Sequence, residues 1–151
     1  MYYPPGRILL VIAGLFLVIF GLIAIGSATT IIAEISYSDI PLMGLPDRLP
    51  NNVSWMGHYW LSFFVGICTT VLGIFALIYR QNTFKMKFLL VAAVSCFVLY
   101  AAFVILSGYH EAFFRGGMLF LPLTFISLVM CNIGAALNFS ALTKHNRQAQ
   151  A

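Results

Sequence analysis

Long stretches without charge alternate with short polar segments along the chain. Four stretches contain no Asp, Glu, Lys or Arg: residues 8–33, 59–79, 88–106 and 118–142. A hydrocarbon core about 30 Å thick needs roughly 20 apolar helical residues to cross it, and each stretch approaches or exceeds that length. The pattern therefore predicts an all-α, integral membrane four-helix bundle with up-down-up-down topology, formed as a single tetraspan domain over residues 1–151.

The polar segments between these stretches predict the connections. We expect outer loops at residues 34–57 and 107–117 and an inner loop at residues 80–87. The first outer loop contains Pro41, Pro46 and Pro50, which disfavour regular structure and favour turns. The other two loops are short, so each should join a pair of antiparallel helices.

Composition and charge add an orientation to this picture. The chain is 62% apolar and 8% charged, against roughly 45–50% and 25% in an ordinary soluble domain. Basic residues near span ends are retained on the cytoplasmic side, and six of the eight fall on one side of the four-span arrangement: Arg7, Arg80, Lys85, Lys87, Lys144 and Arg147. Both termini are therefore expected in the cytoplasm. The net charge of +4 is then a topology signal and does not point to nucleic acid.

The first apolar stretch also has one feature of a secretory signal. Gly26, Ser27 and Ala28 are similar to a small-residue cleavage site. The apolar run continues to Ala33, however, and exceeds the 7–15 residues typical of a signal core. We therefore expect this stretch to remain as the first span.

Small residues recur at seven-residue spacing in all four spans. Helices in lipid associate through close packing over such residues, and a seven-residue period predicts a left-handed bundle. The expected helix-packing residues are Gly14, Gly21, Ala28, Gly66, Gly73, Ser95, Ala102, Ser127, Gly134 and Ala141. Gly66 and Gly73 also form small-xxx-small pairs with Thr70 and Thr69, which packing within the chain or contact with a second copy would both explain.

Metal and cofactor chemistry finds little support in the sequence. Cys68, Cys96 and Cys131 each lie near the middle of a different span, so a thiol-rich metal site is conceivable. No His or carboxylate shares that depth, and a free cysteine is commonly a small buried residue. We expect no metal site and no cofactor. The outer loops contain no cysteine, which argues against claudin-like and tetraspanin-like proteins.

Polar residues at the outer ends of the spans are candidates for ligand or partner contact. His58, His110 and Glu111 are expected near one another, as a cation-binding or proton-sensing cluster or as ordinary wetted helix ends. Asn52 lies in an Asn-Val-Ser acceptor pattern for glycosylation, consistent with an extracellular or lumenal face.

Within the spans the sequence offers amides and hydroxyls but no ionisable side chain that would mark a transport route. Asn132 is the most suggestive of these groups, because a buried amide needs a partner. We expect it either to order the bundle or to line a cavity. No nucleophile with a nearby base and no phosphate-binding glycine loop occurs, so we expect no enzymatic activity.

Residues 7–107 resemble the membrane-spanning four-domains subfamily A. The similarity lies in "GRILLVIAGLFLVIFGLIAIG" of the first span, in Trp60, Gly66, Gly73 and Ala76 of the second, and in the R-x-x-T turn at Arg80 to Thr83. It implies a four-helix bundle with cytoplasmic ends that dimerises and associates with receptors or channels. Topology alone is similar to the MARVEL tetraspan class.

These patterns favour a non-enzymatic accessory or assembly subunit. It would bind a larger integral membrane protein, such as a receptor or channel, through its helix faces and outer loop, with lipid around the rest. The alternative is a small homo-oligomeric channel or carrier, with the Thr/Asn face of the fourth span turned inward. Either would be a multi-pass protein of the plasma membrane or an endomembrane.

Overall fold

The described structure consists of four long helices. The computed structural model describes residues 6–37, 55–80, 82–106 and 120–150. Its helices are α1 (Arg7–Tyr37), α2 (Trp55–Tyr79), α3 (Thr83–Leu106) and α5 (Phe120–Gln150). Each is long and apolar enough to cross a membrane. The expected all-helical fold is confirmed for the described residues, and four such helices are consistent with a multi-pass membrane protein.

The connection between α2 and α3 is shorter than the inner loop predicted at residues 80–87. α3 begins at Thr83 because Asn82 caps it. The Asn82 side-chain oxygen accepts a hydrogen bond from the Lys85 backbone N–H at 3.2 Å, and such a cap satisfies a donor that the first turn leaves open. The Asn82 N–H itself donates to the Tyr79 carbonyl at 3.0 Å. The end of α2 and the start of α3 are therefore hydrogen-bonded to each other.

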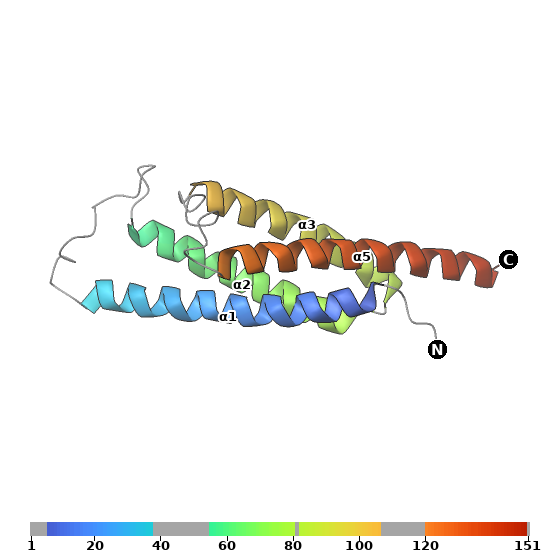
Figure 1. Ribbon diagram of the computed structural model, residues 1–151, viewed down its shortest axis with the longest axis horizontal. Coiled ribbons are helices and arrows are strands. Elements are labelled where there is room, and N and C mark those ends of the chain that lie inside the picture. Colours follow the sequence, from blue (N-terminus) through green and yellow to red (C-terminus); the bar gives the residue numbers. More distant parts are fainter. Residues whose placement is uncertain (1–5, 38–54, 81, 107–119, 151) are drawn as a thin grey trace.

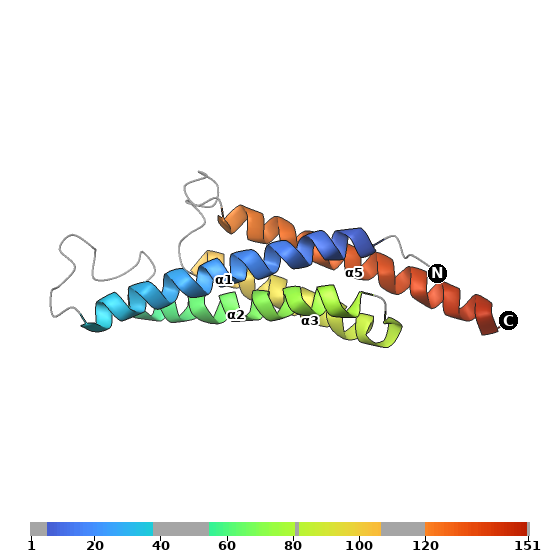
Figure 2. The same ribbon diagram turned by 90° about the horizontal axis from the view of Figure 1, so that it is seen from below.

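Each helix packs against two neighbours, in the order α1, α2, α3, α5 and back to α1. The pair α1 and α2 has the most extensive contact. Neighbouring helices run in opposite directions, so the start of α1 and the end of α5 lie at the same end of the bundle (Figure 1). At that end α5 extends beyond its neighbours (Figure 2).

The buried positions follow a seven-residue period. In α3 the buried side chains are Met86, Ala93 and Tyr100, interleaved with Leu89, Cys96 and Phe103. The same spacing buries Leu121, Leu128, Ala135 and Leu142 of α5. Because this period keeps one stripe of each helix facing its neighbours, the centre of the bundle is filled by side chains along its length.

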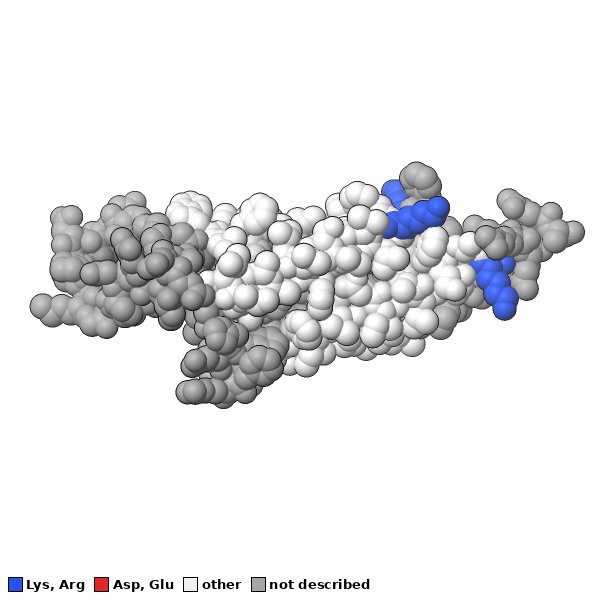
Figure 3. All heavy atoms as spheres, turned by 90° about the horizontal axis from the view of Figure 1, so that it is seen from above, with Lys and Arg blue, Asp and Glu red and all other residues white. Residues whose placement is uncertain are grey.

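The outer surface of the bundle is apolar along the middle and basic at one end. Figure 3 shows white atoms over the described middle and blue Lys and Arg atoms only toward the end that holds the termini. None of the side chains that the structure describes is Asp or Glu. A surface of this kind suits a lipid environment, as the four apolar helices require.

Candidate functional site

The interface between α1 and α2 is built on glycines. A Cβ atom placed on Gly73 would lie 2.7 Å from the Gly14 carbonyl oxygen, and one on Gly66 would lie 3.0 Å from that of Gly21. Real Cβ atoms essentially never come within 3.0 Å of another heavy atom. At position 73 the backbones of α1 and α2 are therefore too close for any residue other than glycine. Gly14, Gly21, Gly66 and Gly73, expected from sequence to pack, therefore face one another in two pairs.

Gly26 of α1 differs from the other described glycines. Nothing lies within 4 Å of the Cβ position at Gly26, whereas a neighbour lies within that distance at Gly6, Gly14, Gly21, Gly66, Gly73 and Gly134. Gly26 is exposed and continues an outward stripe of α1 that contains Leu15, Ile19 and Leu22. We call these four residues the outer stripe of α1. A helical glycine is less favourable than alanine, and packing within this bundle does not offset that cost at Gly26.

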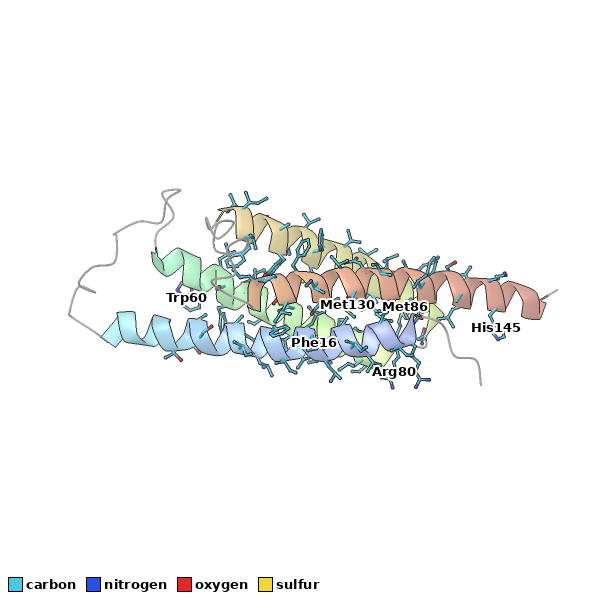
Figure 4. The ribbon with its side chains drawn as sticks, in the orientation of Figure 1. Phe16, Trp60, Arg80, Met86, Met130 and His145 are labelled. Atoms are coloured by element: carbon cyan, nitrogen blue, oxygen red, sulfur yellow. The ribbon has the colours of Figure 1, made fainter. Side chains whose placement is uncertain are left out.

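Asn138 of α5 joins three elements at the basic end of the bundle. Its side chain is fully buried, and its amide nitrogen donates a 3.0 Å hydrogen bond to the Arg80 carbonyl at the end of α2. Its amide oxygen lies 2.7 Å from the Cβ position of Gly6, at the start of α1. Figure 4 shows Arg80 at the end of the bundle opposite Trp60. Asn138 thus ties the last helix to the end of the second.

Asn132 and Tyr100 connect α3 to α5. The Asn132 amide nitrogen donates to the Leu128 carbonyl of its own helix at 2.9 Å and to the Ala93 carbonyl of α3 at a longer 3.3 Å. The Tyr100 hydroxyl donates to the Leu121 carbonyl at 2.7 Å and also hydrogen-bonds with the Thr124 hydroxyl. Asn132, the amide singled out from sequence, therefore lies at a helix interface.

The three cysteines do not form a metal site in the structure. Cys96 and Cys131 are buried and Cys68 is half-buried, all as free thiols. Among the residues that the structure describes, no group of three His, Cys, Asp or Glu side chains is placed to hold a metal ion.

A hollow groove runs along the seam between α2 and α3. One cavity of about 160 Å³ and a second of about 330 Å³ lie on this seam, and both are lined by Cys68, Cys96 and Leu99. Phe64 and Phe103 also line the first, and Phe75 and Phe88 the second. Both are open to the surroundings rather than enclosed. We call this feature the α2–α3 groove.

Ser95 corrects the packing prediction for the third span. The side chain is exposed and lines the α2–α3 groove, so it does not pack inside the bundle. The reason is that α3 carries two stripes of seven-residue spacing, and the buried stripe holds the larger side chains of Met86 and Tyr100 beside Ala93. The small side chain of Ser95 therefore pointed to the outward face of α3, and the face packed inside the bundle carries larger residues.

The remaining predicted residues are distributed as follows. Ala28, Ser127 and Gly134 are buried, and Ala102 and Ala141 are half-buried. His58 lies in α2, but its side chain is outside the described part, as are Asn52, His110 and Glu111.

Sequence reasoning did not single out Gly26 or Lys85 as candidate contact residues. Gly26 is seven residues from Ile19, and Lys85 is seven residues from Ala92 of the groove. This seven-residue spacing could have indicated that Gly26 shares a helix face with Ile19 and that Lys85 shares one with Ala92.

Comparisons of the chain with protein-family models, with curated proteins and with solved structures found no match.

Proposed function

We propose that the protein is a non-enzymatic accessory subunit that binds a larger membrane protein through an outward helix face. In this arrangement the four helices cross the bilayer up and down as a left-handed bundle, with both termini in the cytoplasm. The basic end carries Arg7, Arg80, Lys85, Lys87 and Lys144, and positive residues favour the cytoplasmic side. The outer loops would complete the contact with the partner.

The direction of the polar side chains in the spans supports this function over that of a channel. Thr124, Ser127 and Asn138 of α5 are buried inside the bundle. On the outward side of α1, the hydroxyls of Ser27, Thr29 and Thr30 donate to carbonyls of their own helix. A pore between copies needs polar groups turned outward along a span, whereas Thr124, Ser127 and Asn138 of α5 face inward. The apolar outer surface is better suited to packing.

The outer stripe of α1 is the face that we assign to the partner. Glycine in a membrane helix allows another helix to approach closely, and no described atom lies within 4 Å of the Cβ position at Gly26. Leu15, Ile19 and Leu22 lie on the same face, and each of these residues is about 50% exposed. Gly26 is therefore the observation that carries the assignment.

Site-specific photocrosslinking in native membranes tests this assignment. A photoreactive amino acid at Ile19 should give one discrete adduct with a larger protein. The matched control is Ile133 of α5, whose side chain is 50% exposed, against 49% for Ile19; the same probe there should react with lipid only. Gly26→Leu should remove the Ile19 adduct by filling the approach site, whereas Ala136→Leu, at an exposed position of α5, should leave it.

Two results would argue against an accessory subunit. Equal protein adducts from Ile19 and Ile133 would show that α1 has no special partner. A homo-oligomer that conducts ions in liposomes would favour the alternative of a small channel or carrier. Purification in mild detergent should separate these outcomes, since a larger partner in fixed stoichiometry is expected only for the accessory subunit.

A further inference from the structure

A chain of aromatic contacts links the α2–α3 groove to a lysine toward the basic end of the bundle. Phe75 and Phe88 line the groove there, and their ring centroids lie 6.2 Å apart between α2 and α3. Phe75 also packs on Tyr79 at 5.4 Å, and the Lys85 ammonium lies 4.3 Å from the centre of the Tyr79 ring. Lys85 therefore reaches from α3 across to the end of α2, next to the groove-lining residue Phe75.

Lys85 shares the groove face of α3. It precedes Ala92 by seven residues and Leu99 by two such periods, and both of these residues line the groove. At a rise of about 1.5 Å per residue, Lys85 to Leu99 spans roughly 21 Å. One leaflet is about half of the roughly 30 Å hydrocarbon core, so the groove is long enough to follow a lipid chain from the membrane surface to the midplane.

We propose that the α2–α3 groove binds one anionic phospholipid. An acyl chain lies against the apolar lining between α2 and α3, and the phosphate-bearing head group pairs with the Lys85 ammonium. The lining selects a hydrocarbon chain, because its described side chains are apolar apart from Ser95 and two free cysteines. The charge selects an anionic head group, as basic pockets between membrane helices do.

Lys85 has the chemistry that this pairing requires. Its side chain is exposed, and no carboxylate is present among the described side chains to neutralise it. The Tyr79 ring holds the ammonium beside the groove-lining Phe75, since a cation is attracted to an aromatic face. Placement in the cytoplasmic leaflet, which holds most anionic lipid, rests on the orientation proposed above, whereas binding in detergent does not depend on it.

Lys87 provides a matched control two residues away. Its ammonium lies 5.7 Å from the centre of the Phe139 ring of α5, so it faces the opposite neighbour of α3. Both lysines are exposed and contact an aromatic ring at the same end of the bundle. They differ in that Lys85 contacts Tyr79 of α2, next to the groove-lining Phe75, whereas Lys87 faces α5.

Native mass spectrometry of the purified full chain tests the site. Titration with phosphatidylserine and with phosphatidylcholine of identical acyl chains should give a preference for the anionic lipid of about fivefold, as expected for one lysine. Lys85→Gln should remove that preference, and Lys87→Gln should keep it. Equal losses in the two variants would indicate diffuse surface charge and would overturn the site.

The acyl-chain part of the site needs its own test. Ala92→Trp fills the groove and should lower binding of phosphatidylserine; Ser95→Leu, at an exposed groove position, should do the same with less risk to folding. Unchanged binding in the folded variants would contradict occupation of the groove. Equal binding of soluble glycerophosphoserine would show that the head group alone is recognised. A photoreactive residue at Phe88 that captures a protein instead of lipid would assign the groove to a partner helix.

Discussion

Individual glycines in this bundle have opposite roles that depend on their neighbours. Gly73 lies against the backbone of α1, where an added methyl group would meet the Gly14 carbonyl oxygen. Gly26 has open space at the same atom position. One residue type therefore stabilises an interface within the chain in one place and leaves a surface open in another.

Alanine substitution should separate these two roles. Gly73→Ala should lower the free energy of unfolding by about 1–3 kcal/mol, because overpacking forces the helices apart. Gly26→Ala should instead raise it by up to about 1 kcal/mol, since alanine is the better helix former and meets nothing there. Thermal unfolding of both variants in the same detergent measures the difference. A loss of stability at Gly26 equal to that at Gly73 would contradict the described packing.

The two buried amides should also differ in their contribution to stability. Asn138 donates its 3.0 Å bond to another helix, whereas the shorter bond of Asn132 stays within α5. Interhelical hydrogen bonds in membranes average about 0.6 kcal/mol, with a maximum near 1.7. We expect Asn138→Ala to lie toward the upper figure and Asn132→Ala to cost less. Chemical denaturation in mixed micelles measures the loss of stability in each variant. A larger loss for Asn132→Ala than for Asn138→Ala would contradict this prediction.

At the scale of an element, the start of α3 determines where Lys85 stands. The Asn82 side-chain oxygen accepts a hydrogen bond from the Lys85 backbone N–H. The capping residue and the lysine therefore belong to the same helical turn. The Met86 N–H donates to the Asn82 carbonyl at 2.9 Å and continues the helix. Order in this first turn therefore sets the position of the Lys85 ammonium at the groove.

Removal of the cap should loosen that turn. Asn82→Ala should cost about 1 kcal/mol and increase hydrogen exchange of the Lys85 amide, with little change at Leu99 farther along α3. The preference for phosphatidylserine should fall as well, because Lys85 is less well placed. Exchange measured by mass spectrometry on the intact protein tests this. Unaltered exchange at Lys85 would show that the cap is dispensable.

At the scale of the whole molecule, the basic end gives the bundle a direction. Lys144 lies near this end, while Trp60 lies near the other. Single cysteines at these two positions should report the proposed orientation. A membrane-impermeant maleimide should label Trp60→Cys in intact cells and label Lys144→Cys only after permeabilisation. Trp60 and Lys144 lie at or next to the ends of candidate spans, whereas native Cys68, Cys96 and Cys131 lie well inside them and serve as the unlabelled background. Labelling of Lys144→Cys in intact cells would reverse the orientation.

The general plan of the bundle could be predicted from the sequence, but the use of each helix face could not. Uncharged length identified four membrane helices, and spacing identified the glycines of α1 and α2. The same spacing misassigned Ser95, because the inward and outward faces of α3 are both apolar in a membrane protein. Lys85 was counted as a topology signal, since only its position beside Tyr79 and the groove distinguishes it from Lys87. The predicted cluster of His58, His110 and Glu111 stays a prediction.

The helix interfaces of the bundle differ in extent, and this difference favours one order of helix assembly during synthesis. α1 and α2 are synthesised before α3 and α5, and among the described helices they share the most extensive interface. This helical hairpin can therefore pair in the translocon before α3 is synthesised. α3 then joins across a hollow seam that lipid can enter. The Asn138 side chain of α5 hydrogen-bonds to the Arg80 carbonyl at the end of α2, so this contact forms only after α5 has been synthesised.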